Sequence, residues 1–153
     1  MGRTIVVGDI HGCYEELCEL LELVGFGGED HLVSVGDLIV KGEKNREVLE
    51  LFISDKRFSA VLGNHDRRLL RYWKGEDVSL KRAHEQAIAE LESDKGRYSA
   101  YLDSLPLVLD LGSHLVVHAG IRPGVSLSEQ AVEDLTELRT LGPDRTARDG
   151  TPW

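Results

Sequence analysis

The sequence predicts a single α/β domain, residues 1–153, with a mainly parallel sheet in its N-terminal part. Short apolar, β-branched runs alternate with amphipathic segments of helical period, an order typical of strands joined by crossover helices. A length of 153 residues is enough to bury one hydrophobic core. The chain shows no internal repeat and no linker that would divide it.

The N-terminal part alternates strands and helices in order. Residues 4–7 and 31–35 are apolar runs that end in Gly-Asp, and 58–62 ends in Gly-Asn, so each predicts a buried strand followed by a turn. Residues 14–24 carry leucines and glutamates at helical spacing, which predicts an amphipathic helix closed by the glycines that follow. Residues 45–53 are predicted to form the second crossover helix.

The C-terminal part is expected to be mostly helical, with one hairpin. Three helices are expected first, at 66–73, 79–91 and 97–105. Two strands, 107–111 and 114–117, then flank a Gly-Ser turn, and their antiparallel pairing predicts a mixed sheet. One or two helical pieces are expected in 127–141, before a charged loop at 142–150.

Composition restricts the classes of partner. The formal net charge of −9 argues against a general nucleic-acid binder, which usually carries a basic patch. It does not exclude an anionic substrate, because bound metal ions reverse the local field. The two cysteines, Cys13 and Cys18, lie about 140° apart around the predicted helix and should not pair, which fits a reducing, cytoplasmic compartment. No signal peptide and no membrane partner are expected.

Four short motifs each follow a predicted strand: Gly8-Asp9-Ile10-His11-Gly12, Gly36-Asp37, Gly63-Asn64-His65-Asp66 and His118-Ala119-Gly120. In open α/β sheets, ligands bind beyond the carboxyl ends of the strands. The motifs supply carboxylates, imidazoles and a carboxamide, which suit hard or borderline divalent cations. Two such ions about 3.5–4 Å apart can hold a bridging hydroxide and both oxygens of a displacement at phosphorus. The predicted metal-binding residues are Asp9, His11, Asp37, Asn64 and His118.

From Gly8 to about Arg122, these motifs in this order resemble the metallophosphoesterase (calcineurin-like) superfamily. They are closest to its branch of Ser/Thr phosphoprotein phosphatases and diadenosine tetraphosphatase-like enzymes. The resemblance implies an α/β sandwich with mixed sheets and two divalent metal ions, usually manganese, with iron or zinc as alternatives. It assigns one ion to Asp9, His11 and Asp37, and the other to Asp37, Asn64 and His118. It also makes His65 the acid that protonates the leaving oxygen.

The chain departs from the family pattern in three places. The second motif of the family usually reads Gly-Asp-x-Val-Asp-Arg-Gly; here Val40 replaces the carboxylate that orients the catalytic histidine, and Lys41 replaces a phosphate-binding arginine. Lys41 keeps the charge but loses the bidentate fork, and Arg122 is a second candidate for the substrate phosphate. A further metal-ligating histidine of the family has no counterpart after His118. With the end of the chain at Trp153, this predicts that the C-terminal part of the family domain is missing.

The predicted activity is hydrolysis of phosphate esters or anhydrides by a metal-activated hydroxide. Dinucleoside polyphosphates are the favoured substrates, because diadenosine tetraphosphatase-like members often lack the carboxylate that Val40 replaces. A Ser/Thr protein phosphatase acting on phosphoproteins is an alternative, as is an enzyme for polyphosphate. The alternative of another class is an inactive metal-binding fragment or regulatory protein.

The other histidines and the nearby arginines are expected to lie outside the site. His31 and His84 are predicted to be surface residues. His114 lies about 13 Å from His118 along one strand, too far to share an ion. A set of three arginines in the predicted helix at 66–73 is expected to pair with acidic residues on a solvated face: Arg67, Arg68 and Arg71. Arg139 has a weaker claim on the substrate than Arg122.

Overall fold

The computed structural model describes residues 2–147. Its five strands are β1 (Thr4–Val7), β2 (His31–Ser34), β3 (Phe58–Ala60), β4 (Val108–Asp110) and β5 (Leu115–Val117). Its six α-helices are α1 (Tyr14–Leu23), α2 (Asn45–Ser54), α3 (Asn64–Trp73), α4 (Arg82–Leu91), α5 (Lys95–Ser104) and α6 (Val132–Glu137). Short 3-10 helices occupy Glu92–Asp94 and Leu127–Glu129. The expected α/β fold with parallel and antiparallel strands is confirmed, and the elements begin and end within a few residues of their predicted bounds.

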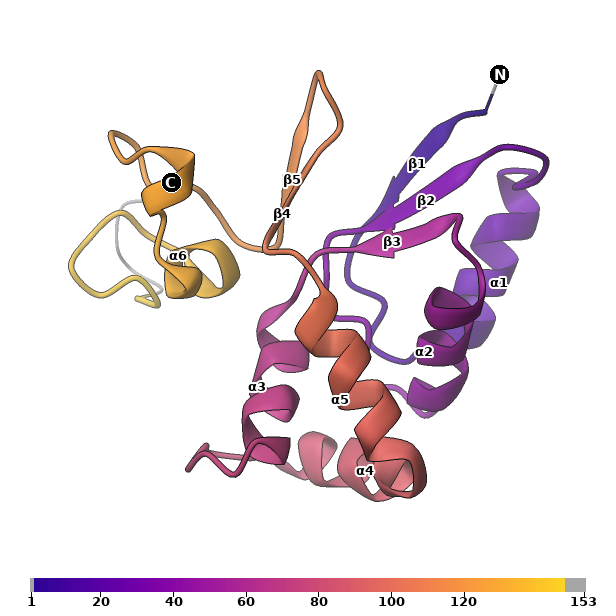
Figure 1. Cartoon of the computed structure of the whole chain (residues 1–153), viewed down its shortest axis with the longest axis horizontal. Coiled ribbons are helices and arrows are strands. Elements are labelled where there is room, and N and C mark those ends of the chain that lie inside the picture. The colour runs from indigo at the N-terminus through magenta and orange to yellow at the C-terminus, as the bar shows by residue number, and fades with distance from the viewer. Residues whose placement is uncertain (1, 148–153) are drawn as a thin grey trace.

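Three parallel strands form the sheet that carries the first three motifs. The order is β1-β2-β3, with Thr4 opposite His31 and Leu32 opposite Phe58. Helices α1 and α2 connect these strands and lie on the same side of the sheet (Figure 1). The carboxyl ends of all three strands therefore point to one edge, which is where the motifs begin.

The hairpin of β4 and β5 is a separate two-stranded antiparallel sheet. Figure 1 shows it standing between the parallel sheet and the C-terminal segment that contains α6. Val116 of β5 packs against Val33 of β2 and Val61, so a small apolar cluster joins the hairpin to the parallel sheet. This contact brings the end of β5, and with it the fourth motif, to the edge that holds the other three.

Helix α3 begins at Asn64, two residues before the predicted start, because Asp66 caps it. The Asp66 carboxylate accepts a hydrogen bond from the backbone N–H of Gly63 at 3.2 Å, at the first turn of the helix. It also accepts hydrogen bonds from the backbone N–H groups of Leu38 and Ile39, each at 3.2 Å. Asp66 is fully buried, so this one side chain joins α3 to the loop after β2.

Asp66→Ala is expected to lower the free energy of unfolding by at least about 3 kcal/mol, because three buried N–H groups would lose their acceptor at about 1–3 kcal/mol each. Asp66→Asn keeps one oxygen and should cost less. Urea denaturation of both variants measures the loss. The control is Asp103→Ala, since Asp103 is exposed and pairs at the surface with exposed Lys74. Equal stability of Asp66→Ala and the control would contradict the conclusion that the hydrogen bonds of Asp66 stabilise the fold.

The prediction that His84 lies on the surface is wrong. Its exposed fraction is 1%, and it shares the buried face of α4 with Ala87 and Leu91. These positions are three and seven residues further along, which is the spacing of one helix face. Helix α4 packs against α2 and α3, so this face is covered. His31 is exposed, as expected.

Cys13 and Cys18 are both free thiols, as predicted from their positions around α1. Among residues 2–147, no helix is long and apolar enough to cross a membrane. The predicted charged loop at 142–150 falls partly outside the described residues.

Candidate functional site

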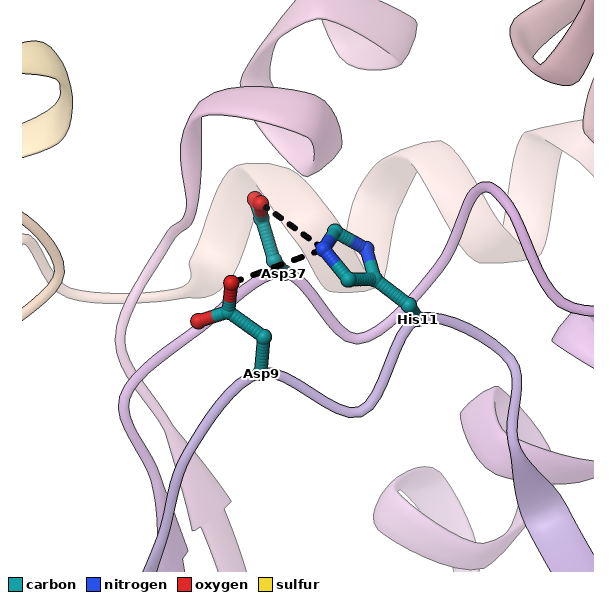
Figure 2. Close-up of side chains that lie close together, drawn as sticks. All are labelled: Asp9, His11 and Asp37. Atoms are coloured by element: carbon teal, nitrogen blue, oxygen red, sulfur yellow. Dashed lines mark ion pairs between the residues drawn. The ribbon is translucent and has the colours of Figure 1, made fainter.

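Asp9, His11 and Asp37 meet at the carboxyl edge of the parallel sheet, as the motifs predict. Asp9 follows β1 and Asp37 follows β2. Nε2 of His11 lies 3.4 Å from Oδ2 of Asp9 and 3.6 Å from Oδ2 of Asp37 (Figure 2). One donor atom from each residue lies within 4.8 Å of the others, so the three side chains can hold a metal ion.

Backbone hydrogen bonds hold these two loops together. The N–H groups of Ile10 and His11 both donate to the carbonyl of Asp37, at 3.1 Å and 2.8 Å. His11 and Asp37 adopt the left-handed conformation, with φ of 53° and 52°. Non-glycine residues are uncommon in this region and cluster at functional sites when the surrounding structure enforces them. Gly63 is required nearby, because a Cβ there would lie 2.1 Å from the backbone nitrogen of Asp37.

Asn64 and His118 lie against the other side of the Asp37 carboxylate. Nε2 of His118 lies 2.8 Å from Oδ1 of Asn64 and 3.7 Å from Oδ1 of Asp37. Asn64 is the first residue of α3, and His118 directly follows β5. The fourth motif therefore meets the third across more than fifty residues of sequence.

Backbone carbonyls orient both histidines that are predicted to bind metal. Nδ1 of His11 lies 3.2 Å from the carbonyl of Ile39, and Nδ1 of His118 lies 2.9 Å from that of Val35. A histidine that donates its Nδ1 proton to a carbonyl presents the lone pair of Nε2, which is the state that a metal requires. In His118, however, both ring nitrogens face oxygen atoms: Nδ1 faces the carbonyl of Val35, and Nε2 faces Oδ1 of Asn64. A neutral imidazole has only one N–H, so it can donate to only one of these oxygens. A cation between these groups would satisfy both, so the residues present fit a bound metal.

The electrostatics of the carboxylates point the same way. Burial raises the pKa of Asp37, whose side chain is only 2% exposed, although His118 and His11 oppose the shift. The hydrogen bond from His11 lowers the pKa of the more exposed Asp9. A carboxylate held in a buried position beside imidazoles is stabilised by added positive charge. The site therefore favours the binding of cations.

His65 lies beside this group on the first turn of α3. Its backbone N–H donates to Oδ1 of Asp37 at 2.8 Å, and its ring meets the ring of His11 edge to face, with centroids 5.2 Å apart. Burial, together with the charge of Lys41 and the neighbouring His84, lowers the pKa of His65 to about 3. The imidazole is therefore neutral at ordinary pH and carries a single N–H.

A cleft of about 490 Å³ opens over these side chains. Three basic residues line it together with the site: Lys41, Arg68 and Arg139. Nζ of Lys41 lies 2.5 Å from Nε2 of His11, so the ammonium group of this lysine lies next to the nitrogen that would face a metal. Lys41 reaches this position because it and Val40 take positive φ values of 84° and 74° in a tight loop.

Arg122, the other predicted phosphate ligand, is not among the residues that line the cleft. Its guanidinium pairs with Asp134 of α6, at 2.9 Å and 3.1 Å, and also donates to the carbonyl of Leu141. Asp134 is buried, so Arg122 is held within the C-terminal segment.

Arg68 and Arg139 both line the cleft. From the sequence, Arg68 was expected on a solvated helix face, and Arg139 was given a weaker claim on the substrate than Arg122. Arg68 lies three residues after His65, so the two share a face of α3, and this spacing is the signal that could have found it. The two other arginines of that helix pair with acidic residues as predicted, Arg67 with Glu133 and Arg71 with Glu76. The Arg71 side chain is the more exposed of the two, but that of Arg67 is only 16% exposed and does not lie on a solvated face. Arg139 follows α6 and carries no comparable signal.

Comparisons with known proteins identify the family. A family model described as calcineurin-like phosphoesterase matches residues 2–150. Among relatives, a protein of Neisseria gonorrhoeae named bis(5'-nucleosyl)-tetraphosphatase, symmetrical, is 38% identical over 76% of this chain and 43% of its own length. The protein of the same name from Methylococcus capsulatus is 36% identical over 88% of this chain and 49% of its own. The chain thus spans a little under half the length of these curated relatives.

Solved structures agree with the sequence relatives. A crystal structure of a protein assigned as a diadenosine tetraphosphatase covers 99% of this chain and 68% of its own, with a TM-score of 0.81 and 33% identity. A Ser/Thr phosphatase from Saccharomyces cerevisiae covers 98% of this chain with a TM-score of 0.64, but its 22% identity indicates a shared fold alone. The match of the family model over nearly the whole sequence, together with these relatives, shows that the chain belongs to the calcineurin-like phosphoesterase family.

Proposed function

We propose that this chain hydrolyses phosphate esters or anhydrides, with dinucleoside polyphosphates as its substrates and two divalent metal ions as cofactors. One observation carries the proposal: the two oxygens of Asp37 face different donor groups. Oδ2 lies 3.6 Å from Nε2 of His11, and Oδ1 lies 3.7 Å from Nε2 of His118. A carboxylate shared between two sets of ligands is the arrangement expected of a bridging residue in a two-metal site.

In this proposal, Asp9, His11 and Asp37 hold one ion, and Asp37, Asn64 and His118 hold the other. The ions would act as Lewis acids on the phosphate and activate water as the nucleophile. Manganese is the ion we propose because the resemblance to the family implies it; the mixture of carboxylate, carboxamide and imidazole donors fits a hard or borderline divalent cation. Within the chain, Lys41 supplies positive charge beside the reacting phosphate. His65 assists the leaving oxygen with the N–H of its neutral ring.

Two observations favour dinucleoside polyphosphates over a phosphoprotein. Outside the metal-binding group, the cleft is lined by Lys41, Arg68 and Arg139 against one acidic residue, Glu137, and this excess of positive charge suits a substrate with several phosphates in a row. The names of the relatives point to the same class.

The chain's free thiols are consistent with the cytoplasm as its compartment.

The purified chain tests this proposal after treatment with a chelator, with and without added manganese. We expect manganese to raise the melting temperature and to switch on the conversion of diadenosine tetraphosphate into two molecules of ADP, the products of symmetrical cleavage. A generic aryl phosphate and a phosphopeptide serve as comparison substrates.

The outcomes separate the alternatives. Faster turnover of the phosphopeptide would favour a protein phosphatase. A rise in melting temperature without turnover of any substrate would indicate a metal-binding protein that lacks activity. No effect of manganese, zinc or magnesium on either measurement would contradict the metal site itself.

A further inference from the structure

His84 touches His65 although no motif of the sequence includes it. Nε2 of His84 lies 3.1 Å from Nδ1 of His65, and the ring planes are nearly parallel, at 16°. The two residues come from different helices, His65 from the first turn of α3 and His84 from α4. This contact lies on the side of the His65 ring that carries Nδ1.

The direction of the hydrogen bond follows from the other nitrogen of His84. Nδ1 of His84 lies 3.2 Å from the backbone nitrogen of Lys81, which has an N–H and no lone pair to offer. Nδ1 must therefore accept, and the proton of a neutral His84 sits on Nε2. It follows that His84 donates to Nδ1 of His65, and the proton of His65 sits on Nε2.

His84 is held firmly enough to impose this arrangement. Its exposed fraction is 1%, and it lies on the buried face of α4 with Ala87 and Leu91. Because α4 packs against α3, the helix that carries His65, the distance between the two rings is set by helix packing. Val40, which stands where the motif of the family has an orienting carboxylate, is an apolar residue buried in the core.

We propose that His84 is a positioning residue for the hydrolysis proposed above: it fixes the ring of His65 and keeps its proton on Nε2. His65 then acts as a neutral hydrogen-bond donor to the charge that develops on the leaving oxygen. A neutral imidazole can polarise an oxygen in this way without becoming an imidazolium ion. An orienting carboxylate would do the opposite, because it would accept a hydrogen bond from Nδ1 and so keep the proton of a neutral ring on that nitrogen. The inference rests on the proposed function only for its kinetic consequences.

Nitrogen-15 NMR of histidine-labelled protein, loaded with diamagnetic zinc, tests the hydrogen bond without any need for turnover. We expect Nδ1 of His65 to have the chemical shift of an unprotonated nitrogen and Nε2 that of a protonated one. The His65→Ala variant assigns the signals. In His84→Leu, the preference for this tautomer should be lost. A protonated Nδ1 in the unaltered protein would overturn the proposal, whatever the chain does to phosphates.

Kinetics test whether the contact matters for the reaction. We expect His84→Leu to lower kcat by roughly 10–100-fold, the range for groups that orient a reacting residue from outside, with little change in KM. His84→Gln keeps an N–H near the position of Nε2 and should restore most of this loss. His114→Gln, at an exposed histidine, is the matched control. Equal losses in the Leu and Gln variants would count against the hydrogen bond.

A double-mutant cycle separates positioning from a structural role. If His84 acts through His65, then His84→Leu should cost almost nothing more in a His65→Ala background. An undiminished further loss in that background would overturn the proposal. The melting temperature and its rise with zinc are measured for each variant. A variant that keeps both has a folded site, so its kinetics report on His65 alone.

Discussion

Asp37→Asn is expected to abolish metal-dependent turnover and to weaken the binding of both ions. The Asp37 side chain faces both His11 and His118, so its charge would serve both ions at once. The loss of metal affinity should exceed the roughly 10–100-fold that removal of an outer-shell partner costs. Turnover of diadenosine tetraphosphate and the metal-induced rise in melting temperature provide the two measurements.

The same variant should leave the chelator-treated protein as stable as before, or more stable. Asparagine has nearly the shape of aspartate, and its oxygen can still accept the hydrogen bond from the N–H of His65. It also removes a buried carboxylate whose pKa is raised by burial. The matched control is Asp103→Asn, an exposed carboxylate paired with Lys74. Near-normal turnover in Asp37→Asn would contradict the shared ligand and the two-metal site built on it.

His65→Ala is expected to lower kcat by roughly 10²–10³-fold on substrates with poor leaving groups, the usual cost of removing one hydrogen-bond donor to developing negative charge. The ring lies in the cleft beside the metal-binding group, where its single N–H can meet the departing oxygen. Aryl phosphates with acidic phenols need little such help, so their loss should be much smaller. A series of aryl phosphates of graded leaving-group pKa measures the difference.

A control separates this role from an effect on the metal site. The hydrogen bond from His65 to Asp37 comes from its backbone N–H, which alanine keeps, so metal binding should survive the substitution. The metal-induced rise in the melting temperature of His65→Ala should therefore match that of the unaltered protein. The control variant His114→Ala should show the same rise. An equal loss across all leaving groups would rule out assistance to the leaving oxygen and leave a role for the ring in substrate binding.

The sequence was sufficient to predict the arrangement of Asp9, His11 and Asp37. Each follows a strand of one parallel sheet, and parallel strands joined by crossover helices end at the same edge. The apolar runs and the glycines after them are local signals, so the strands and motifs could be found without knowing the packing. His118 follows a strand of the separate hairpin, so strand order alone does not predict its position, and it was found through its motif. The apolar contact of β5 with β2 brings it to this edge.

What the sequence did not predict depends on contacts between elements. His84 was expected on the surface because a lone histidine in a polar helix carries no obvious signal, although its spacing to Ala87 and Leu91 was present. Arg122 follows a motif directly, yet the nearby α6 offers it a buried carboxylate, Asp134, and that contact holds it away from the cleft lining. Such competition between partners is decided only once the helices are packed.

The backbone hydrogen bonds between the loops of His11 and Asp37 bear on how the protein acquires metal. The two loops are joined through peptide groups, so the hydrogen bonds that bring their donor atoms together involve no metal ligand atom. Ordering of the ligands is then part of folding, unlike in small zinc domains that remain unfolded until metal binds. For the metal site proposed above, it follows that loss of an ion would not by itself undo the pairing of these loops.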